Sequence, residues 1–232
     1  MKECAADLAK HNVLGVDLEF CGDRRSRIAA LLQISTLETD YVIDVLILRE
    51  RVGPILTPVF ADEKIVKVFH GSDIDILLLL TDLEVEVINI FDTARAFGEM
   101  TKCGDKSEHR FVSFDYLVTA LLGIKVNKFF QVAEWKLRPL PKVMMNYSRA
   151  DSHYLLYIYA ILIDLISGYE NKVQLLNSTY TENSSWLDIR NSKSHQWNKV
   201  LDDFTQGMNK FLLQRIEKSG TRTFKVIVHG RE

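Results

Sequence analysis

The sequence contains little cysteine, with three residues in 232 (Cys4, Cys21 and Cys103) and no CxxC pair. An odd number at this spacing builds neither a disulfide framework nor a zinc site, which favours a reducing compartment such as nucleus or cytosol. Apolar runs fall well short of the roughly 20 residues that cross a bilayer. The first residues (MKECAADLAKH) lack the apolar stretch of a signal peptide. We therefore expect no membrane partner.

A surplus of positive charge is also absent, because 29 Lys and Arg face 31 Asp and Glu, for a formal charge of −2. Proteins that hold nucleic acid by bulk electrostatics usually carry a basic excess. If the partner is nucleic acid, a few side chains and bound metal have to meet its phosphates locally. The motifs GxxxxGK[ST], HExxH and GxSxG are missing too, so the sequence gives no support for ATP, zinc-peptidase or serine-hydrolase chemistry.

Strands and helices alternate in the first half of the chain. Apolar segments bounded by polar turns predict five strands: Val13–Phe20, Ala29–Thr36, Asp40–Val45, Ile65–His70 and Val87–Phe91. The first three are expected to form an antiparallel meander. A helix is predicted over Ser72–Leu80 with Ser72 as its N-cap, and Leu48–Phe60 is expected to be helical only in short pieces, because Pro54 and Pro58 interrupt it. The alternation indicates an α/β domain with a largely buried sheet.

The second half is helical. Apolar residues three and four apart predict three helices: Thr93–Met100, Phe114–Leu122 and Leu140–Ser167. Polar Met100–Arg110 predicts a loop. We expect a folded domain over residues 1–170, a polar linker over 171–195, and a C-terminal amphipathic helix with a short extension over 196–232. The helix spans Gln196–Lys218 and precedes a β-like end at Thr223–His229; we expect it to fold back on the domain, with docking on a partner chain as the alternative.

Two acids, Asp17 and Glu19, lie in an apolar strand and face the same side, because strand residues two apart share a face. Buried acids without a cationic neighbour are costly unless a cation or a proton relieves them. Carboxylate oxygens at this spacing suit Mg²⁺ or Mn²⁺. For a DxE taken alone, the ordinary interpretation is that one acid points to solvent at the strand end.

Two helices supply further candidates. Asp73 and Asp75 open the apolar helix in HGSDIDILLLL, where acids in a first turn are also ordinary capping residues. Tyr147 and Asp151 in YSRADSHYLLYIY lie one turn apart on one helix face. A phenol with a pKa near ~10 becomes a base only beside a cation. In isolation, this pair could also be a core aromatic residue next to a surface acid.

Taken together and in this order, Asp17, Glu19, Asp75, Tyr147 and Asp151 resemble the DEDDy class of 3′–5′ exonucleases. The nearest branch is RNase D, and within it the nuclear-exosome-associated exonuclease. The resemblance runs from about residue 13 to residue 159 and includes VDLEF, LLQIST, DYVIDV, KVFHGSDIDIL, NIFDT, EWKLRPLP and YSRADSHYLLYIY. It implies an RNase H-like α/β fold with a mixed five-stranded sheet flanked by helices. The helical HRDC domain of RNase D relatives is not recognisable after residue 170.

The resemblance also implies a role for each residue. The reaction would be two-metal hydrolysis of single-stranded RNA from its 3′ end, in RNA processing or decay, with release of nucleoside 5′-monophosphates. Asp17 would bridge two Mg²⁺ or Mn²⁺ ions, and Glu19 and Asp151 would complete the first. Asp75, rather than Asp73, would hold the second ion through water. Tyr147 would orient and deprotonate the attacking water. The RNA exosome is an expected partner, and the nucleus is the expected location.

Five residues are candidate substrate contacts: His70, Lys128, Trp135, Lys136 and Arg138. His70 could equally be a satisfied buried histidine, and the basic residues around Trp135 could equally be a surface charge cluster rather than a phosphate or stacking site. Gln33 is expected to be structural. Two alternative functions stay open, a catalytically silent RNA-binding scaffold on the same fold and an exonuclease that acts on DNA.

Overall fold

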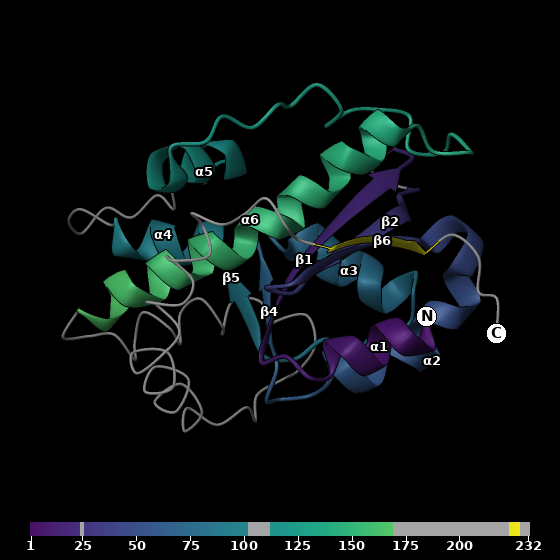
Figure 1. Cartoon of the computed structure of the whole chain (residues 1–232), viewed down its shortest axis with the longest axis horizontal. Helices are drawn as coiled ribbons and strands as arrows, with labels where there is room; N and C mark the ends of the chain where they lie inside the picture. The colour runs from purple at the N-terminus through teal and green to yellow at the C-terminus, as the bar shows by residue number, and fades with distance from the viewer. Residues whose placement is uncertain (24–25, 102–111, 169–222, 228–232) are drawn as a thin grey trace.

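The computed structural model describes residues 1–23, 26–101, 112–168 and 223–227, which form a mixed six-stranded sheet with helices packed on its faces (Figure 1). The strands are β1 (Val13–Cys21), β2 (Ile28–Ser35), β3 (Thr39–Asp44), β4 (Val66–Phe69), β5 (Ile90–Asp92) and β6 (Thr223–Ile227). The helices are α1 (Lys2–Leu8), α2 (Val45–Phe60), α3 (Asp73–Thr81), α4 (Thr93–Met100), α5 (Phe114–Leu122) and α6 (Lys142–Ser167).

The strand order is β5-β4-β1-β2-β3-β6. Strands β1, β2 and β3 form the predicted antiparallel meander, and β4 and β5 continue the sheet in parallel beside β1. The α/β fold class is confirmed, but the sheet has six strands where five were expected. The sixth is β6, from the predicted β-like end, and it pairs in parallel along β3 from Thr39–Thr223 to Ile43–Ile227. It covers a strand edge of β3 that would otherwise expose unpaired backbone groups.

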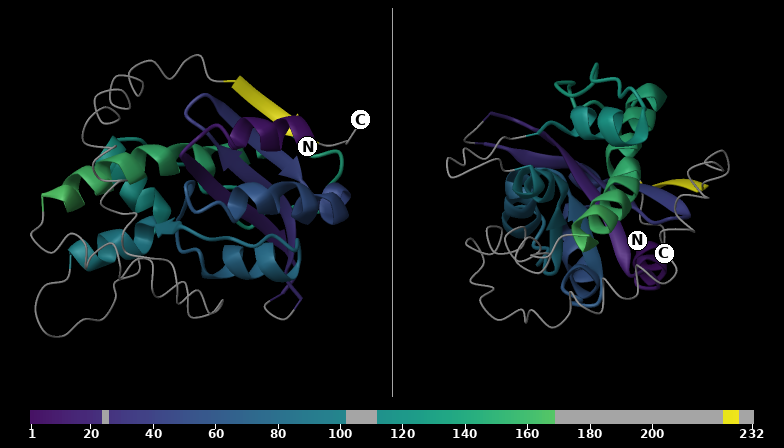
Figure 2. Two further views of the ribbon diagram at one scale, coloured as in Figure 1. Left: turned by 90° about the horizontal axis from the view of Figure 1, so that it is seen from below. Right: turned by 90° about the vertical axis from the view of Figure 1, so that its left-hand side faces the viewer.

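The alternation of side chains along β1 separates a core from a site. Leu14, Val16 and Leu18 point to one face and are buried in the main hydrophobic core with residues of α1, α2 and α3. Residues of the opposite parity, Asp17 and Glu19 among them, point to the other face, which α6 crosses (Figures 1 and 2). One strand therefore stabilises the fold with one face and presents its acids with the other.

Helix α2 is continuous from Val45 to Phe60, so the prediction of short broken pieces was wrong. Pro54 and Pro58 are both exposed and lie one turn apart on the solvent face. Carbonyl groups freed by the missing proline N–H groups can bind water there, which lowers the usual penalty for proline inside a helix. The opposite face carries buried apolar residues that hold the helix on the sheet.

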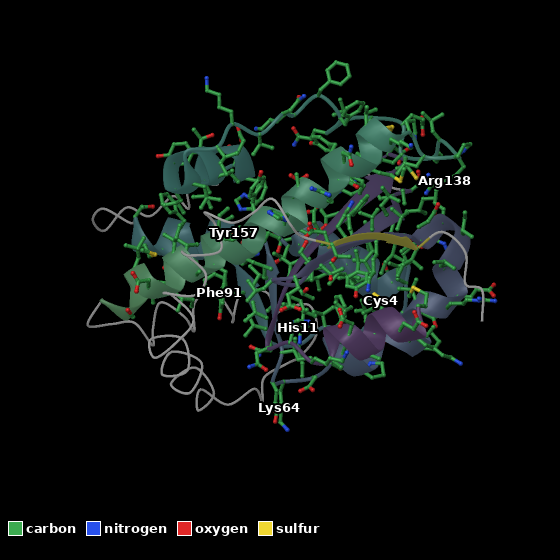
Figure 3. The ribbon with its side chains drawn as sticks, in the orientation of Figure 1. Cys4, His11, Lys64, Phe91, Arg138 and Tyr157 are labelled. Carbon is green, nitrogen blue, oxygen red and sulfur yellow. The ribbon has the colours of Figure 1, made fainter. Side chains whose placement is uncertain are left out.

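Helix α6 begins after Pro141 and contains no glycine or proline in its 26 residues. Buried Leu155, Ile158 and Leu162 pack it against the sheet and against α4 and α5. Phe91 of β5, labelled in Figure 3, belongs to this contact and packs edge-on against the ring of Tyr159 at 4.8 Å between centroids. The helix carries Tyr147 and Asp151 in its first half, and it crosses β1 near the acids of that strand.

Several predicted segments lie outside the described residues. They are the loop over Met100–Arg110 beyond residue 101, the linker over 171–195 and the amphipathic helix over Gln196–Lys218. In the part of the chain that the structure describes, no helix combines the length and the apolar character needed to cross a membrane.

Candidate active site

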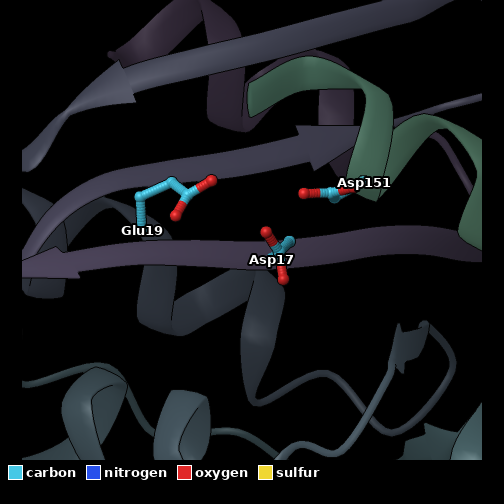
Figure 4. A group of neighbouring side chains, drawn as sticks. All are labelled: Asp17, Glu19 and Asp151. Atoms are coloured by element: carbon cyan, nitrogen blue, oxygen red, sulfur yellow. The ribbon is translucent and has the colours of Figure 1, made fainter. Parts of the chain in front are cut away.

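Three carboxylates converge between β1 and α6 (Figure 4). Asp17 and Glu19 come from β1 and Asp151 comes from α6, and one oxygen of each lies within 4.8 Å of the others. The β1–β2 pairing shifts register between Glu19 and Phe20, which is the mark of a β-bulge. Bulges of this kind re-aim side chains beside functional sites. The three acids form a cluster of the size that one divalent cation occupies.

Asp75 approaches the same cluster from α3. It is buried and lines the same pocket as Asp17, although it lies outside the group of three. Asp73, two residues earlier, is exposed and pairs with Arg95. Ser72 occupies the N-cap position of α3 as predicted, but its hydroxyl makes no capping bond and donates instead to Asp92. The structure therefore separates the two acids of this motif, with Asp75 in the site and Asp73 at the surface.

The turn that aims α3 depends on Asp92, which the sequence reasoning did not single out. Its buried carboxylate accepts hydrogen bonds from the backbone N–H groups of Gly71 and Ser72 at 3.1 and 2.8 Å. It also caps α4, accepting from the N–H groups of Ala94 and Arg95. The sequence did carry a signal for this capping role, since an Asp followed by Thr directly after a strand, as in NIFDT, is a typical helix N-cap.

Electrostatics in the cluster is unfavourable without a cation. Burial, followed by the charges of Asp151, Asp75 and Glu19, raises the pKa of Asp17. Burial also raises the pKa of Glu19, with help from Asp151 and Asp75. The pKa of Asp75 rises to about 8, chiefly by burial, and that of Asp151 rises to about 7 for the same reason.

The four acids have no ion-pair partner among the residues that the structure describes. Buried carboxylates are normally paired or coordinate metals, because an uncompensated buried charge is costly. Carboxylate oxygens are the ligands that Mg²⁺ and Mn²⁺ prefer. The donor set therefore fits a hard divalent cation.

Tyr147 lies one turn before Asp151 on α6 and is half-buried. Its ring packs on Phe130 at 5.7 Å and on Trp135 at 6.1 Å between centroids, so the phenol is held at the wall of the pocket. Burial, and then the nearby carboxylates of Asp151 and Glu19, raises the pKa of Tyr147. Without a cation the hydroxyl therefore stays protonated and can act as a hydrogen-bonding group.

An open pocket of about 700 Å³ contains the four acids and Tyr147. His70, Lys128 and Trp135 also line it, whereas Lys136 and Arg138 do not. This volume lies in the range of small-molecule binding sites.

The five predicted substrate contacts differ from one another in whether they line the pocket and in which residues they bind. His70 uses both ring nitrogens, at 2.9 Å from the Thr93 hydroxyl and 2.8 Å from the Val112 carbonyl oxygen. Lys128 lines the pocket and forms an ion pair with Asp115. Trp135 is only 1% exposed, so a base has no free ring face to stack on.

Arg138 differs from its expected role as a phosphate contact. Its guanidinium binds Asp44 and donates to the carbonyl oxygen of Trp135 at 2.8 Å, near the start of α6 (Figure 3). This pairing fastens the segment before α6 to the end of β3. Lys136 stays exposed. A substrate role for Arg138 therefore loses its geometric support, and that of Lys136 stays a prediction.

Gln33 lies directly opposite Asp17 in the β1–β2 pairing and is fully buried. Neither polar atom of its amide has a hydrogen-bond partner among the described residues. An isolated amide inside a strand of Leu and Ile is unfavourable. The structure thus gives this residue a position beside the site that the sequence did not reveal.

Comparisons with known proteins show which family this chain belongs to. Residues 1–167 match the family model described as 3′–5′ exonuclease. Protein RRP6-like 3 of Arabidopsis thaliana is 42% identical over 164 residues, covering 68% of this chain and 17% of that protein. Exosome complex exonuclease RRP6 of Saccharomyces cerevisiae is 44% identical over 155 residues, covering 66% of this chain and 20% of that protein.

Solved structures show the same fold. The catalytic core of RRP6 from Trypanosoma brucei superposes with a TM-score of 0.68 at 31% identity, covering 78% of this chain and 47% of that one. RNase D of Escherichia coli has a TM-score of 0.65 at 18% identity and covers 95% of this chain and 59% of that one. The chain spans less than a quarter of the length of the first curated relatives that it matches. By its family match and its relatives, the chain belongs to the 3′–5′ exonuclease family of RRP6 and exosome component 10, with the fold of RNase D.

Proposed function

We propose that this chain is a divalent-cation-dependent exoribonuclease that shortens single-stranded RNA from its 3′ end and releases nucleoside 5′-monophosphates. One observation carries the proposal. Four acids from β1, α3 and α6 meet in one open pocket, and none is paired with a cation within the described residues. Such a set is unfavourable for stability alone, so its presence supports cation binding.

Each acid has a role that its position supports. Asp17 faces both Asp151 and Asp75, and we assign it the bridging position between two cations. Glu19 and Asp151 would complete one cation site, since their oxygens lie within 4.8 Å of that of Asp17. Asp75 would hold the other through water. When bound, two Mg²⁺ or Mn²⁺ ions would neutralise charge on the attacking and leaving oxygens of an in-line displacement.

Tyr147 is assigned to the attacking water. Its ring is held by Phe130 and Trp135, so the hydroxyl has a fixed direction beside Asp151. Because the pKa of Tyr147 is raised, the hydroxyl first orients the water as a hydrogen-bond partner. It could accept the proton of water only as the phenolate, after releasing its own proton to solvent, and this requires positive charge that compensates the neighbouring carboxylates and lowers the pKa of the phenol.

The substrate and partners are inferred from relatives. Exosome complex component 10 homologues from Drosophila melanogaster and Caenorhabditis elegans are 33% and 36% identical to this chain. RNase D of Trypanosoma brucei, 21% identical and similar in fold, is known in complex with RNA U12. We therefore propose RNA 3′ ends as the substrate, the exosome or another processing factor as a partner, and the nucleus as the location. Residues 1–170 would form the nuclease unit.

The test is a time course on 5′-labelled single-stranded RNA and on DNA of the same sequence, with Mg²⁺, Mn²⁺ or EDTA. We expect a ladder of products shortened one nucleotide at a time, 5′-monophosphates as the released species, and no cleavage in EDTA or with Asp17→Asn. Cleavage that prefers DNA would change the substrate assignment. RNA binding without cleavage by the wild type would instead indicate a silent scaffold.

A further inference from the structure

Helix α6 approaches the sheet unusually closely just after Asp151. A Cβ atom added to Gly15 of β1 would lie 2.3 Å from the carbonyl oxygen of Ser152, which only glycine avoids. Gly15 is two residues before Asp17, and Ser152 follows Asp151 directly. A close contact between strand and helix therefore lies beside the carboxylates that the two elements contribute.

A buried chain of hydrogen bonds fixes the helix at the same level. The Ser152 hydroxyl lies 2.9 Å from the Ser35 hydroxyl of β2, and Ser35 donates to Asp40 of β3 at 2.8 Å. Because the single proton of Ser35 goes to Asp40, a hydrogen bond between the two hydroxyls uses the Ser152 proton, whose other acceptor is the Arg149 carbonyl oxygen at the longer distance of 3.4 Å. Ser35, Asp40 and Ser152 are fully buried.

His153, the next residue of α6, also binds Asp40. Its Nδ1 lies 3.0 Å from Asp40 and donates to that carboxylate, and its ring packs between Tyr154 and Tyr157. Asp40 thus accepts from two directions, one bond from the sheet and one from the helix. Apolar contacts alone would let α6 slide or rotate slightly on β1, whereas directional bonds at two consecutive helix residues resist both movements.

We propose that Asp40, Ser35, Ser152 and His153 are positioning residues that hold α6 so that Asp151 faces Asp17 and Glu19. The inference rests on the proposed role of that cluster as a cation site. None of the four positioning residues lines the pocket, and each acts through Asp151. Groups that orient metal ligands in this way typically contribute about 10–100-fold to metal affinity or activity.

Tyr41 provides a matched control variant for Asp40. Tyr41 follows Asp40 on β3, points to the opposite face, and donates from its hydroxyl to Asp7 of α1 at 2.6 Å. Tyr41→Phe removes a hydrogen bond that joins a helix to the same strand, but it leaves α6 untouched. A loss of stability shared by both variants can therefore be separated from an effect on the site.

The experiment is a Mn²⁺ titration followed by melting temperature on the full chain, with RNA cleavage recorded in parallel. For Asp40→Asn and the smaller change Ser152→Ala, we expect the Mn²⁺ concentration of half-maximal stabilisation to rise by about 10–100-fold, with a matching shift for cleavage. The KM for RNA should stay within twofold of wild type. Tyr41→Phe should melt earlier but keep the wild-type Mn²⁺ midpoint.

Two replacements of His153 on α6 add a rescue experiment to this test. His153→Ala should shift the Mn²⁺ midpoint as Asp40→Asn does, while His153→Asn, whose amide nitrogen can occupy the place of Nδ1, should return it toward wild type. Wild-type midpoints in Asp40→Asn and Ser152→Ala would overturn the positioning role alone. If the wild type itself is neither stabilised by Mn²⁺ nor active, the cation site fails and the positioning role fails with it.

Discussion

Replacing Asp151 by asparagine should stabilise the cation-free protein. Burial raises the pKa of this carboxyl from an ordinary 3.8 to about 7. The folded state therefore holds the proton more tightly than the unfolded state, so stability is greatest at low pH and falls as the pH rises from about 4 to about 7. Above pH 7 the whole penalty is present. The pKa differs by roughly three units between the folded and unfolded states. At about 1.4 kcal/mol for each unit, this corresponds to about 4 kcal/mol in the free energy of unfolding.

Asparagine keeps the shape of the side chain and removes this penalty. For a chain of this size, 1 kcal/mol shifts the melting temperature by about 2–4 °C, so Asp151→Asn should melt about 10 °C above wild type at pH 8 in EDTA. Most of the gain should be lost at pH 4.5, where the wild-type carboxyl is protonated in the fold.

Thermal melts in EDTA at the two pH values measure the effect, with Asp164→Asn as the control. Asp164 lies on the exposed side of the same helix, so its replacement should change the melting temperature by little at either pH. Added Mn²⁺ should reverse the order of stability, since only the wild type keeps the full set of ligands. If the variant melts at or below wild type at pH 8 in EDTA, the ionised Asp151 carboxylate does not destabilise the cation-free fold.

Three further predictions concern catalysis, a buried lysine and the C-terminal strand. Tyr147→Phe keeps the ring contacts with Phe130 and Trp135, so it should fold as wild type while single-turnover cleavage slows by ~10²–10⁴-fold; an unchanged rate would make this tyrosine a packing residue only. Burial lowers the pKa of the fully buried Lys67 to about 7, so its cost to stability is complete below pH 7 and disappears toward pH 10.5. Lys67→Met should therefore raise the melting temperature more at pH 6 than at pH 9.5, and an equal effect at both values would contradict this. A chain that ends at residue 168 loses β6 and its pairing with β3, so it should melt earlier than the full chain although it keeps all four acids; an unchanged melting temperature would show that β6 adds nothing to the fold.

Much of the fold could be predicted from local pattern. The meander of β1 to β3 follows from apolar segments separated by short turns, and α6 follows from apolar residues at helical spacing. Two features could not be predicted this way. Helix α2 passes through two prolines because both happen to face water, and β6 pairs with a strand about 180 residues earlier. Both outcomes depend on tertiary placement, which local sequence does not encode.

The site could be anticipated in part for a similar reason. Asp17 and Glu19 share a strand face, and that follows from strand geometry alone. That Asp151 would come within 4.8 Å of them depends on how α6 crosses β1, and the residues that set this crossing, Gly15 and Asp40, carry no local signal of their role. Arg138 shows the converse case, because a basic residue in a polar segment resembles a phosphate contact until its partner Asp44 is seen.

Anomalous diffraction from crystals soaked in Mn²⁺ would locate the cations in the pocket. Two Mn²⁺ peaks are expected there, about 3.5–4 Å apart. One should lie among Asp17, Glu19 and Asp151, and the other between Asp17 and Asp75. Both peaks should be lost in Asp17→Asn crystals soaked in the same way. A pocket without Mn²⁺ at a concentration that supports RNA cleavage would show that these four acids do not hold the catalytic cations.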